Sequence, residues 1–492
     1  MNLTESEFES LKKKYNIIPL YKEIIADLDT PVGAFVKLNK KPSFLLESVI
    51  GGEKWGRYSI IGVDPCISII VQKRKVKLVK FNSTFIYDDV NPFQFLKDFY
   101  KEFRVYQDKN LPRFFIGMVG YISYDTVKLF EKVPDIDKPS VDMPDIFLMV
   151  PETVLIFDNL RQSIKIVYNV MVERNIEYKE AETKIDEIIC VLKNHQDERF
   201  RTYLTFPEKE LRMPIKEFSS NFTKEEFIDI VKKAKEYIYS GDIIQVVLSQ
   251  RFETNLSRDP FDIYRSLRII NPSPYMFYID TGDSYLIGSS PEILVRVEEG
   301  NITVRPIAGT RPRGKTEQED IELERQLLSD EKEKAEHIML VDLGRNDVGR
   351  VAKVGSVNVT EFMIVERYSH VMHIVSNVEG KLLEGLDIFD VFMSCFPAGT
   401  VTGAPKVRAM QIIEELENIK RGVYAGAIGY FSFTGNMDMC IGIRMLVVKD
   451  TKIYIQAGAG IVADSIPENE YNETVSKATA MLKAVNFLGE KI

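Results

Sequence analysis

The apolar positions of the first 200 residues follow mainly the rhythm of β-strands. Residues 66–89 alternate between apolar and polar side chains, and residues 114–125 and 145–170 are rich in β-branched and aromatic residues. Such patterns are typical of antiparallel strands and meanders. A short helix and a lead-in strand are predicted for residues 1–30, and further helices for residues 92–104 and 175–194.

The second half of the chain has clearer helix signals. Thr223 and Glu226 form a capping box at the start of a predicted helix that ends near Gly241. Its apolar stripe consists of Phe227, Ile230, Val231, Ala234 and Ile238. One long charged helix is predicted over 321–345, and strands over 243–251, 368–376, 424–431 and 439–444. The polar stretch 195–222 has no clear period and is the best candidate for a domain connection.

Composition limits the possible functions. The chain has 492 residues, 45% of them hydrophobic and 28% charged, with a net charge of −9. This size suggests two or three domains, and the acidic balance argues against a nucleic-acid or membrane-surface protein. No signal peptide or membrane-spanning run is present in the sequence. Four widely spaced cysteines favour reduced thiols in a cytoplasm.

The stretch 452–474 combines features suited to an anion and to a cation. A predicted strand leads into Gly458-Ala459-Gly460, where small residues let a ligand approach the backbone. Ser465 and Glu468 suggest a helix start with a capping box. In that helix Glu470 and Glu473 lie one turn apart. The alternative interpretation is a tight turn followed by a solvated acidic face.

Several other polar residues sit in apolar surroundings and have two interpretations each. Gln245 in a strand is either a structural hydrogen-bonding group or part of a site. Glu292 is either a surface turn residue or a carboxyl whose raised pKa makes it an acid. His373 is either a core histidine or a proton-transfer group. Arg444 ends an apolar strand, where an anion or a carboxylate partner is expected.

A second pair of carboxylates, Glu333 and Glu336, faces one side of the helix predicted over 321–345. Glu336 lies where the helix turns apolar, so burial next to a cation is expected. Together with Glu470 and Glu473 this gives two carboxylate pairs. Mg²⁺ is the expected ion, because it uses one or two carboxylates together with substrate oxygens.

These segments together resemble the chorismate-utilising enzymes. The resemblance rests on seven motifs in family order: PIAGTRPRG (306–314), EHIMLVDLGRND (336–347), RYSHVMH (367–373), FPAGTVTGAPK (396–406), YAGAIGYF (424–431), IGIRM (441–445) and QAGAGIVADSIPENEYNET (456–474). Segments LLES (45–48) and GRYSIIG (56–62) extend it over nearly the whole chain. It implies an α+β fold of mainly antiparallel sheets with helices packed outside. A strand-rich regulatory domain (1–200) would be intertwined with a catalytic domain (223–492).

The resemblance also implies a role for individual residues. Glu336 and Glu473 match the Mg²⁺ ligands, and Glu333 and Glu470 support them through water. Glu292 matches the general acid near the leaving hydroxyl, and His373 the histidine of pyruvate elimination. Contacts to chorismate are implied for Gly309, Thr310, Thr400, Tyr424, Arg444, Gly458, Ala459 and Gly460.

The members that form anthranilate match best. They are carbon–oxygen lyases of tryptophan biosynthesis that aminate chorismate with ammonia and release pyruvate. Relatives that form isochorismate or salicylate carry lysine where Gln245 stands, and aminodeoxychorismate synthases carry lysine where Ala308 stands. The resemblance implies a separate glutamine amidotransferase subunit as the ammonia source. The two kinds of subunit would form a hetero-oligomer, namely a heterotetramer. The competing hypothesis is a non-catalytic homologue that only binds chorismate or tryptophan.

A feedback site for L-tryptophan is implied by two further segments. Glu47 and Ser48 of LLES, with Pro274, Tyr275 and Met276 of NPSPYM, resemble the family's tryptophan pocket. On residues alone, Glu47 could hold an ammonium group beside an apolar wall, and the alternative is a strand with an exposed edge. Relatives can keep this pocket as a structural feature without regulation.

Overall fold

The computed structural model describes residues 1–48, 56–193, 218–368 and 371–486. Most of the predicted connection over 195–222, and Ser369 and His370 of the RYSHVMH motif, lie outside the described residues. The elements of the first half are α1 (Glu5–Leu11), β1 (Ile17–Ile25), α2 (Pro31–Leu38), β2 (Ser43–Glu47), β3 (Tyr58–Gln72), β4 (Lys75–Lys80), β5 (Ser83–Tyr87), α4 (Pro92–Lys101), β6 (Gly117–Ile122), η1 (Tyr124–Leu129), β7 (Ile146–Asp158), β8 (Ser163–Met171), η2 (Val172–Arg174) and α5 (Tyr178–Lys193).

The second half contains more and longer helices. Its elements are β9 (Ser219–Ser220), α6 (Lys224–Tyr239), β10 (Gln245–Asn255), α7 (Pro260–Ile270), β11 (Tyr275–Asp280), β12 (Ser284–Ser290), β13 (Ile293–Glu298), β14 (Asn301–Val304), β15 (Ile307–Pro312), α8 (Glu317–Ser329), α9 (Glu331–Gly349), β16 (Asn358–Arg367), β17 (Val371–Lys381), α10 (Ile388–Cys395), η4 (Gly399–Val401), β18 (Gly403–Ala404), α11 (Lys406–Leu416), β19 (Ala427–Ser432), β20 (Met437–Ile441), β21 (Met445–Lys449), β22 (Lys452–Ile461) and α12 (Pro467–Asn486).

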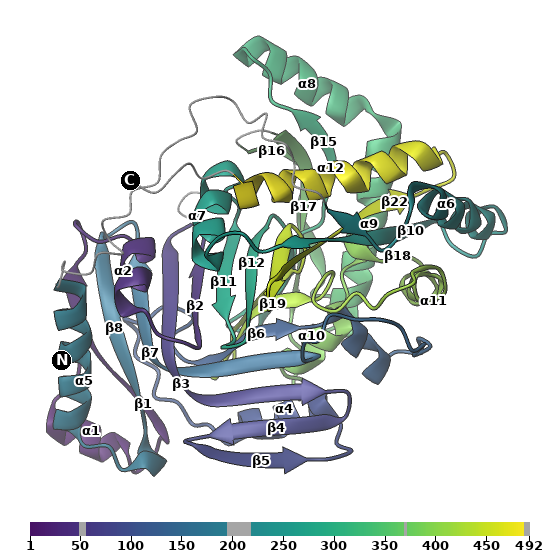
Figure 1. The fold of residues 1–492 in the computed structure, drawn as a ribbon. Coiled ribbons are helices and arrows are strands. Elements are labelled where there is room, and N and C mark those ends of the chain that lie inside the picture. The colour runs from purple at the N-terminus through teal and green to yellow at the C-terminus, as the bar shows by residue number, and fades with distance from the viewer. Residues whose placement is uncertain (49–55, 194–217, 369–370, 487–492) are drawn as a thin grey trace.

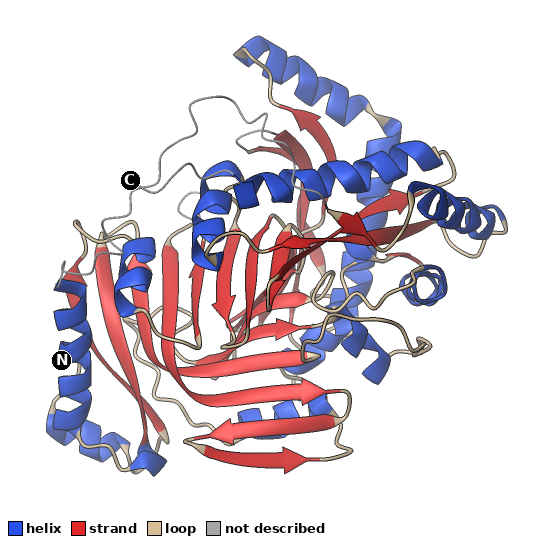
Figure 2. Ribbon diagram, in the orientation of Figure 1, coloured by secondary structure: helices blue, strands red, loops and turns tan. Residues whose placement is uncertain are grey.

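Antiparallel pairing joins the two halves into one sheet system. Strand β2 pairs with β11, which places Glu47 opposite Met276, and β6 pairs with β19, which places Gly120 opposite Gly429. The helices lie outside the strands, and α12 crosses β22 and β10 (Figures 1 and 2). The predicted fold class and the intertwining of the halves are therefore confirmed, whereas the domain limits stay a prediction.

The hydrophobic core is shared between the halves as well. One buried cluster contains Phe114 of the first half together with Phe277 and Phe392 of the second. A second buried cluster contains Leu45 of the first half together with Leu482 of α12. Side chains of both halves therefore contribute to each of these clusters. Among the described residues, no helix is long and apolar enough to cross a bilayer.

Helix caps account for one agreement and one difference between the predicted and the observed helices. The capping box of α6 is present: Thr223 N–H donates to Glu226 Oε2 at 2.8 Å, and Glu226 N–H donates to Thr223 Oγ1 at 3.2 Å. The single helix predicted over 321–345 is wrong, because the chain breaks at Asp330. The Asp330 carboxylate accepts hydrogen bonds from the backbone N–H groups of Lys332 and Glu333 and so caps a new helix, α9.

The start of α12 also differs from the prediction. The helix begins at Pro467, and the N–H groups of Asn469 and Glu470 bond to the carbonyl of Ile466. Ser465 does not act as the cap, because its hydroxyl accepts a hydrogen bond from the backbone N–H of Val462 at 3.0 Å. Ser465 instead ties down the turn between β22 and the helix.

Candidate active site

One cavity of about 650 Å³ gathers nearly all of the residues predicted to carry the chemistry. It lies between helices α9 and α12 and the strands β10, β15, β17 and β22. The predicted residues that line it are Glu292, Gly309, Thr310, Glu333, Glu336, His373, Thr400, Tyr424, Arg444, Gly458, Gly460, Glu470 and Glu473. Ala459 is the exception: its side chain is fully buried on the other face of β22 and does not line the cavity.

Two helices bring the two carboxylate pairs to this cavity. Helix α9 contributes Glu333 and Glu336, and α12 contributes Glu470 and Glu473. Burial raises the pKa of Glu336, and the charges of Glu333 and Glu473 raise it further. Burial and Glu473 likewise raise the pKa of Glu470. Carboxylates that raise each other's pKa form a site that a cation would stabilise.

The donor set fits a hard ion that shares its ligands with a substrate. Within the described residues, no three His, Cys, Asp or Glu side chains are grouped closely enough to hold a metal ion alone. Mg²⁺ needs only one or two carboxylates when substrate oxygens and water complete its shell. The buried Oε1 of Gln245 has no hydrogen-bond partner among the described residues, while its Nε2 lies 3.5 Å from Glu336 Oε1. The residues present therefore fit Mg²⁺ at Glu336 and Glu473.

Lys477 is a residue of this cavity that the sequence analysis missed. Its Nζ lies 2.6 Å from Glu473 Oε1 and donates to the carbonyl of Gly458 at 3.0 Å. The i,i+4 spacing from Glu473 on α12 is the sequence signal that could have indicated this contact. A divalent ion at Glu473 has to share the Glu473 carboxylate with Lys477 or displace Lys477. Glu333 also has a cationic partner, because it forms an ion pair with Arg311 at 3.1 Å.

Glu292 is a buried acid and not a surface turn residue. Its side chain lies beside the backbone N–H of Ile307, and Thr400 Oγ1 donates to Glu292 Oε1 at 2.6 Å. Burial raises the pKa of Glu292 to about 8, a stronger effect than the opposing hydrogen bonds. Glu292 is therefore mostly protonated at neutral pH and can donate its proton.

His373 is held in one orientation by strand pairing. Residue Thr310 of β15 pairs with His373 of β17, and His373 Nδ1 lies 3.1 Å from the carbonyl of Gly309 and 3.0 Å from Thr310 Oγ1. We assign the Nδ1 hydrogen to the bond with the carbonyl, which leaves Nε2 as an acceptor. Burial and the charge of Arg444 lower the pKa of His373. The imidazole is therefore neutral at pH 7 and able to accept a proton.

Arg444 is placed as a receptor for an anion. It follows β20 with a left-handed backbone, φ 52°. Among the described residues no carboxylate lies within ion-pair distance of its guanidinium. Burial lowers the pKa of Arg444, so a ligand anion in the cavity would relieve an unfavourable desolvation.

Two glycines of β22 make room for their neighbours across the cavity. A Cβ on Gly458 would approach the hydroxyl of Tyr424 to 2.7 Å. A Cβ on Gly460 would approach Gln245 Nε2 to 2.6 Å. The small residues predicted for close backbone approach thus serve first to accommodate the side chains of Tyr424 and Gln245.

A separate cavity of about 380 Å³ is lined by all five residues predicted for tryptophan: Glu47, Ser48, Pro274, Tyr275 and Met276. The role of Glu47 towards an ammonium group stays a prediction, and the carboxylate already has partners within the chain. Its oxygens accept hydrogen bonds from Tyr264 Oη at 2.5 Å and from Arg268 Nε at 3.0 Å. Helix α7 thus provides two partners of this carboxylate that the local sequence could not reveal.

Comparisons with known proteins assign the chain to a class. The model of the chorismate binding enzyme family matches residues 43–483. The crystal structure of anthranilate synthase component I from Streptococcus pneumoniae superimposes with a TM-score of 0.77 and 37% identity, covering 93% of this chain and 99% of that one. The chain belongs to the chorismate-binding enzymes.

Individual relatives are similar over their full length. The anthranilate synthase component 1 of Aquifex aeolicus is 54% identical over 494 residues, covering 100% of this chain and 99% of the relative. That of Acetivibrio thermocellus is 49% identical over 492 residues, with 99% of each chain covered. The menaquinone-specific isochorismate synthase of Escherichia coli shares the fold, with a TM-score of 0.68, at 18% identity.

Proposed function

We propose that this chain is the synthase subunit that converts chorismate and ammonia to anthranilate and pyruvate, with Mg²⁺ as cofactor. Full-length identities of 46–54% to proteins named anthranilate synthase component 1 support the reaction. The observation that carries the proposal is the meeting of four glutamates, Arg444, His373 and Glu292 in one cavity.

The cavity suits a dianionic ring. Glu336 and Glu473 would hold Mg²⁺, which supplies a positive charge for the ring carboxylate of chorismate. Arg444 and Tyr424 would bind the enolpyruvyl carboxylate, since the guanidinium has no carboxylate partner among the described side chains. Each of the two carboxylates of the substrate would thus be bound by a separate positive charge.

Proton transfers follow from the states of Glu292 and His373. Ammonia forms a bond to C2 of the ring while the 4-hydroxyl leaves as water, taking a proton from Glu292. The new ammonium group then loses one proton, which restores the protonated form of Glu292. The product of this step is aminodeoxyisochorismate. His373 Nε2 then accepts the ring proton as pyruvate leaves and the ring becomes aromatic.

Two positions favour this reaction over those of related enzymes. Gln245 cannot serve as the base for water that lysine provides in isochorismate and salicylate synthases. Ala308 lines the cavity where aminodeoxychorismate synthases carry lysine, so a covalent lysine route is not available there. A binding-only homologue would have no need for a neutral buried acid and a neutral histidine in the same cavity.

The proposal includes partners and regulation. The component 1 name of the relatives implies a second component. We propose that this partner is a glutamine amidotransferase that supplies ammonia, and that the two subunits form a heterotetramer. L-Tryptophan would bind in the cavity lined by Ser48 and Pro274 and inhibit the enzyme. A cytoplasmic location is consistent with the four cysteines, which are all free thiols.

The direct test is product analysis with chorismate, Mg²⁺ and ammonium. We expect anthranilate fluorescence and equimolar pyruvate, both abolished by EDTA and restored by Mg²⁺. Chorismate that is bound but not consumed would contradict the enzyme proposal, and isochorismate as the product would place the chain with another branch of the family.

His373→Ala should separate the two chemical steps. Without the neutral imidazole, pyruvate elimination should slow by roughly 10²–10⁴-fold, while amination should change little. Quenched reactions analysed by chromatography should then accumulate aminodeoxyisochorismate. The rate of chorismate consumption is the internal control, and undiminished anthranilate formation would contradict the assignment.

Ser48→Ala should weaken inhibition by tryptophan. Loss of one hydrogen bond to a bound ligand costs about 1 kcal/mol, so the inhibition constant should rise by about five- to tenfold. The uninhibited rate should stay close to that of the wild type, because Ser48 does not line the active-site cavity. An unchanged inhibition curve would show that tryptophan does not use this cavity.

A further inference from the structure

A buried ion pair, Glu417 and Arg421, lies outside the residues assigned to the reaction. Both side chains are only 1% exposed, and Arg421 Nη2 lies 2.6 Å from Glu417 Oε1. Arg421 Nε donates a second hydrogen bond to Glu417 Oε2 at 2.9 Å, so the contact is bidentate. Ser249 of β10 donates to the same carboxylate from its backbone N–H and from its hydroxyl, each at 2.8 Å. The orientation of the guanidinium is therefore fixed from one side.

The remaining donors of Arg421 reach the backbone beside the active site. Nη1 donates to the carbonyl of Val401 and Nη2 to the carbonyl of Val247, both at 2.7 Å. Val401 and Val247 line the active-site cavity, whereas Arg421 does not. Val401 follows Thr400, whose hydroxyl donates to the carboxyl of Glu292. Arg421 thus holds the segment that presents the hydrogen-bond partner of the proposed acid.

The guanidinium of Arg421 also contacts two tyrosine rings. Its Cζ lies 4.7 Å from the ring centroid of Tyr124 and 5.7 Å from that of Tyr424. Cation–π contacts of this kind are stabilising, and they are stronger away from water. A Cβ on Gly458 would approach the Tyr424 hydroxyl to 2.7 Å, so β22 restricts this side chain as well. Tyr424 is therefore confined by Arg421 and by β22 in the wall of the active-site cavity.

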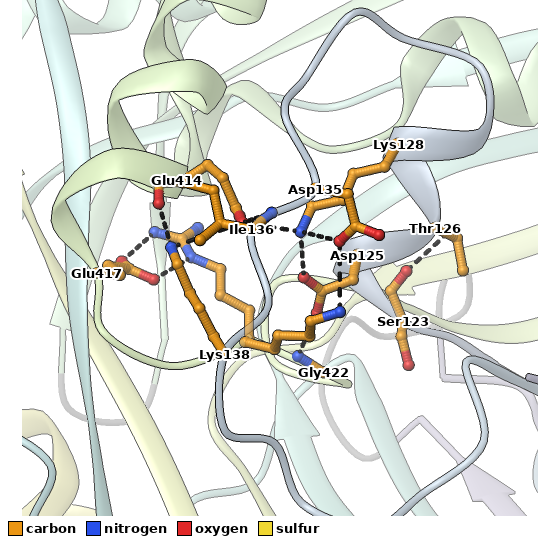
Figure 3. Close-up of polar contacts among 12 residues, drawn as sticks. Ser123, Asp125, Thr126, Lys128, Asp135, Ile136, Lys138, Glu414, Glu417 and Gly422 are labelled. Atoms are coloured by element: carbon orange, nitrogen blue, oxygen red, sulfur yellow. Dashed lines mark hydrogen bonds and ion pairs between the residues drawn. The ribbon is translucent and has the colours of Figure 1, made fainter. Parts of the chain in front are cut away.

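Tyr124 connects this arginine to the first half of the chain. Its backbone N–H donates to the carbonyl of Gly422 at 2.8 Å, and the N–H of Gly422 donates to Asp125 Oδ2 at 2.8 Å. Lys128 Nζ lies 3.4 Å from Asp125 Oδ1 and 3.0 Å from Glu414 Oε1 of α11 (Figure 3). Side chains of the first half thus support the turn that carries the arginine.

We propose that Arg421 is a positioning residue of the active site, which fixes the hydroxyl groups of Tyr424 and Thr400 together. This inference rests on the proposed function, in which Tyr424 binds chorismate and Thr400 bonds to the acid Glu292. Arginine suits this role because its planar group offers five N–H donors in fixed directions and stacks on aromatic rings. A lysine at this position would keep the charge opposite Glu417, but it could not reach both carbonyls and support both rings.

Arg421→Lys tests this role through the binding of chorismate. With ammonium and Mg²⁺ in excess, the KM for chorismate should rise by about fivefold or more, because the Tyr424 hydroxyl loses its fixed place. In a Tyr424→Phe background the same substitution should add little further, since both changes act through one contact. An arginine that only stabilised the fold would lower the amount of active enzyme and leave the KM unchanged.

The pH profile of Arg421→Lys gives an independent measurement. Thr400 lowers the pKa of Glu292 by donating to its carboxylate, so a displaced Thr400 should raise that pKa. The protonated acid then persists to higher pH, and the descending limb of the variant should lie at higher pH than that of the wild type. Combining Arg421→Lys with Thr400→Val should move the limb no further than Thr400→Val alone.

Arg408→Lys is the matched control. Arg408 lies on α11 and has the same kinds of partner, because it lies 2.8 Å from Asp242 and its Cζ lies 5.2 Å from the ring centroid of Tyr237. None of these three residues lines the active-site cavity. The KM for chorismate and the pH profile of this variant should therefore match those of the wild type.

A second variant guards against misfolding of Arg421→Lys. Tyr124→Leu leaves the buried ion pair intact and replaces one of the two aromatic rings, so the KM for chorismate should rise by about twofold to fivefold. An unchanged KM and an unchanged pH limb in whichever of the two variants is folded would overturn the positioning role. A wild-type protein that forms no anthranilate would instead refute the proposed function, so the two failures are distinguishable.

Discussion

Glu336→Gln should lower Mg²⁺-dependent anthranilate formation by about 10³-fold or more. The substitution keeps the size of the side chain but removes a charge that would hold the ion, and a metal ion contributes several kcal/mol of charge stabilisation. Burial and the charges of Glu333 and Glu473 already raise the pKa of Glu336, so its negative form depends on a cation. The measurement is turnover as a function of Mg²⁺ concentration, together with calorimetric titration of Mg²⁺ in the presence of chorismate.

Glu470→Gln is the matched control for this prediction. Glu470 lines the same cavity from α12 but would support the ion only through water. Its loss should weaken Mg²⁺ binding by a smaller factor, about tenfold to a hundredfold. Near-normal turnover and Mg²⁺ affinity in Glu336→Gln would contradict the metal role of this residue.

Glu292→Gln should reduce the amination step by roughly 10²–10⁴-fold, because the leaving hydroxyl loses its proton donor. The wild-type enzyme should also show a descending pH limb that the variant lacks. Glu292 acts in its protonated form, which is present below its pKa of about 8 and is lost above it. The rate should therefore be steady from pH 6.5 to 7.5 and fall by about tenfold per pH unit well above 8.

Thr400→Val tests the origin of this pKa. The hydroxyl of Thr400 donates to the Glu292 carboxylate and so lowers the pKa that burial raises. Removing it should shift the descending limb to higher pH while the rate at pH 7 is largely kept. A pH profile that is identical in Glu292→Gln and wild type would show that another group is the acid.

The sequence predicted much of the fold because its signals are local. The capping box at Thr223 and the alternation of residues 66–89 identify elements without reference to the rest of the chain. The break at Asp330 also has a local signal, since aspartate is a strong N-cap residue. The pairing of β2 with β11 had no local signal, because it joins strands about 230 residues apart, as their bounds show.

The candidate site likewise combines features that the local sequence predicts with features that depend on distant segments. The i,i+3 spacing of Glu333 and Glu336 placed both on one face of a helix, and the structure brings them to the cavity that also contains Glu473. The engagement of Glu47 by Arg268 and of Ala459 by the core depends on packing between distant segments. Such packing determines which predicted side chains reach a ligand, and periodicity alone does not contain it.

The most direct test of the central claim is to locate the divalent ion in crystals grown with Mn²⁺ and a benzoate analogue of the ring acid. We expect one anomalous peak between Glu336 and Glu473, with the analogue's carboxylate on the ion and its ring directed towards Arg444. A peak bound elsewhere, or an analogue seated away from both glutamates, would contradict the account.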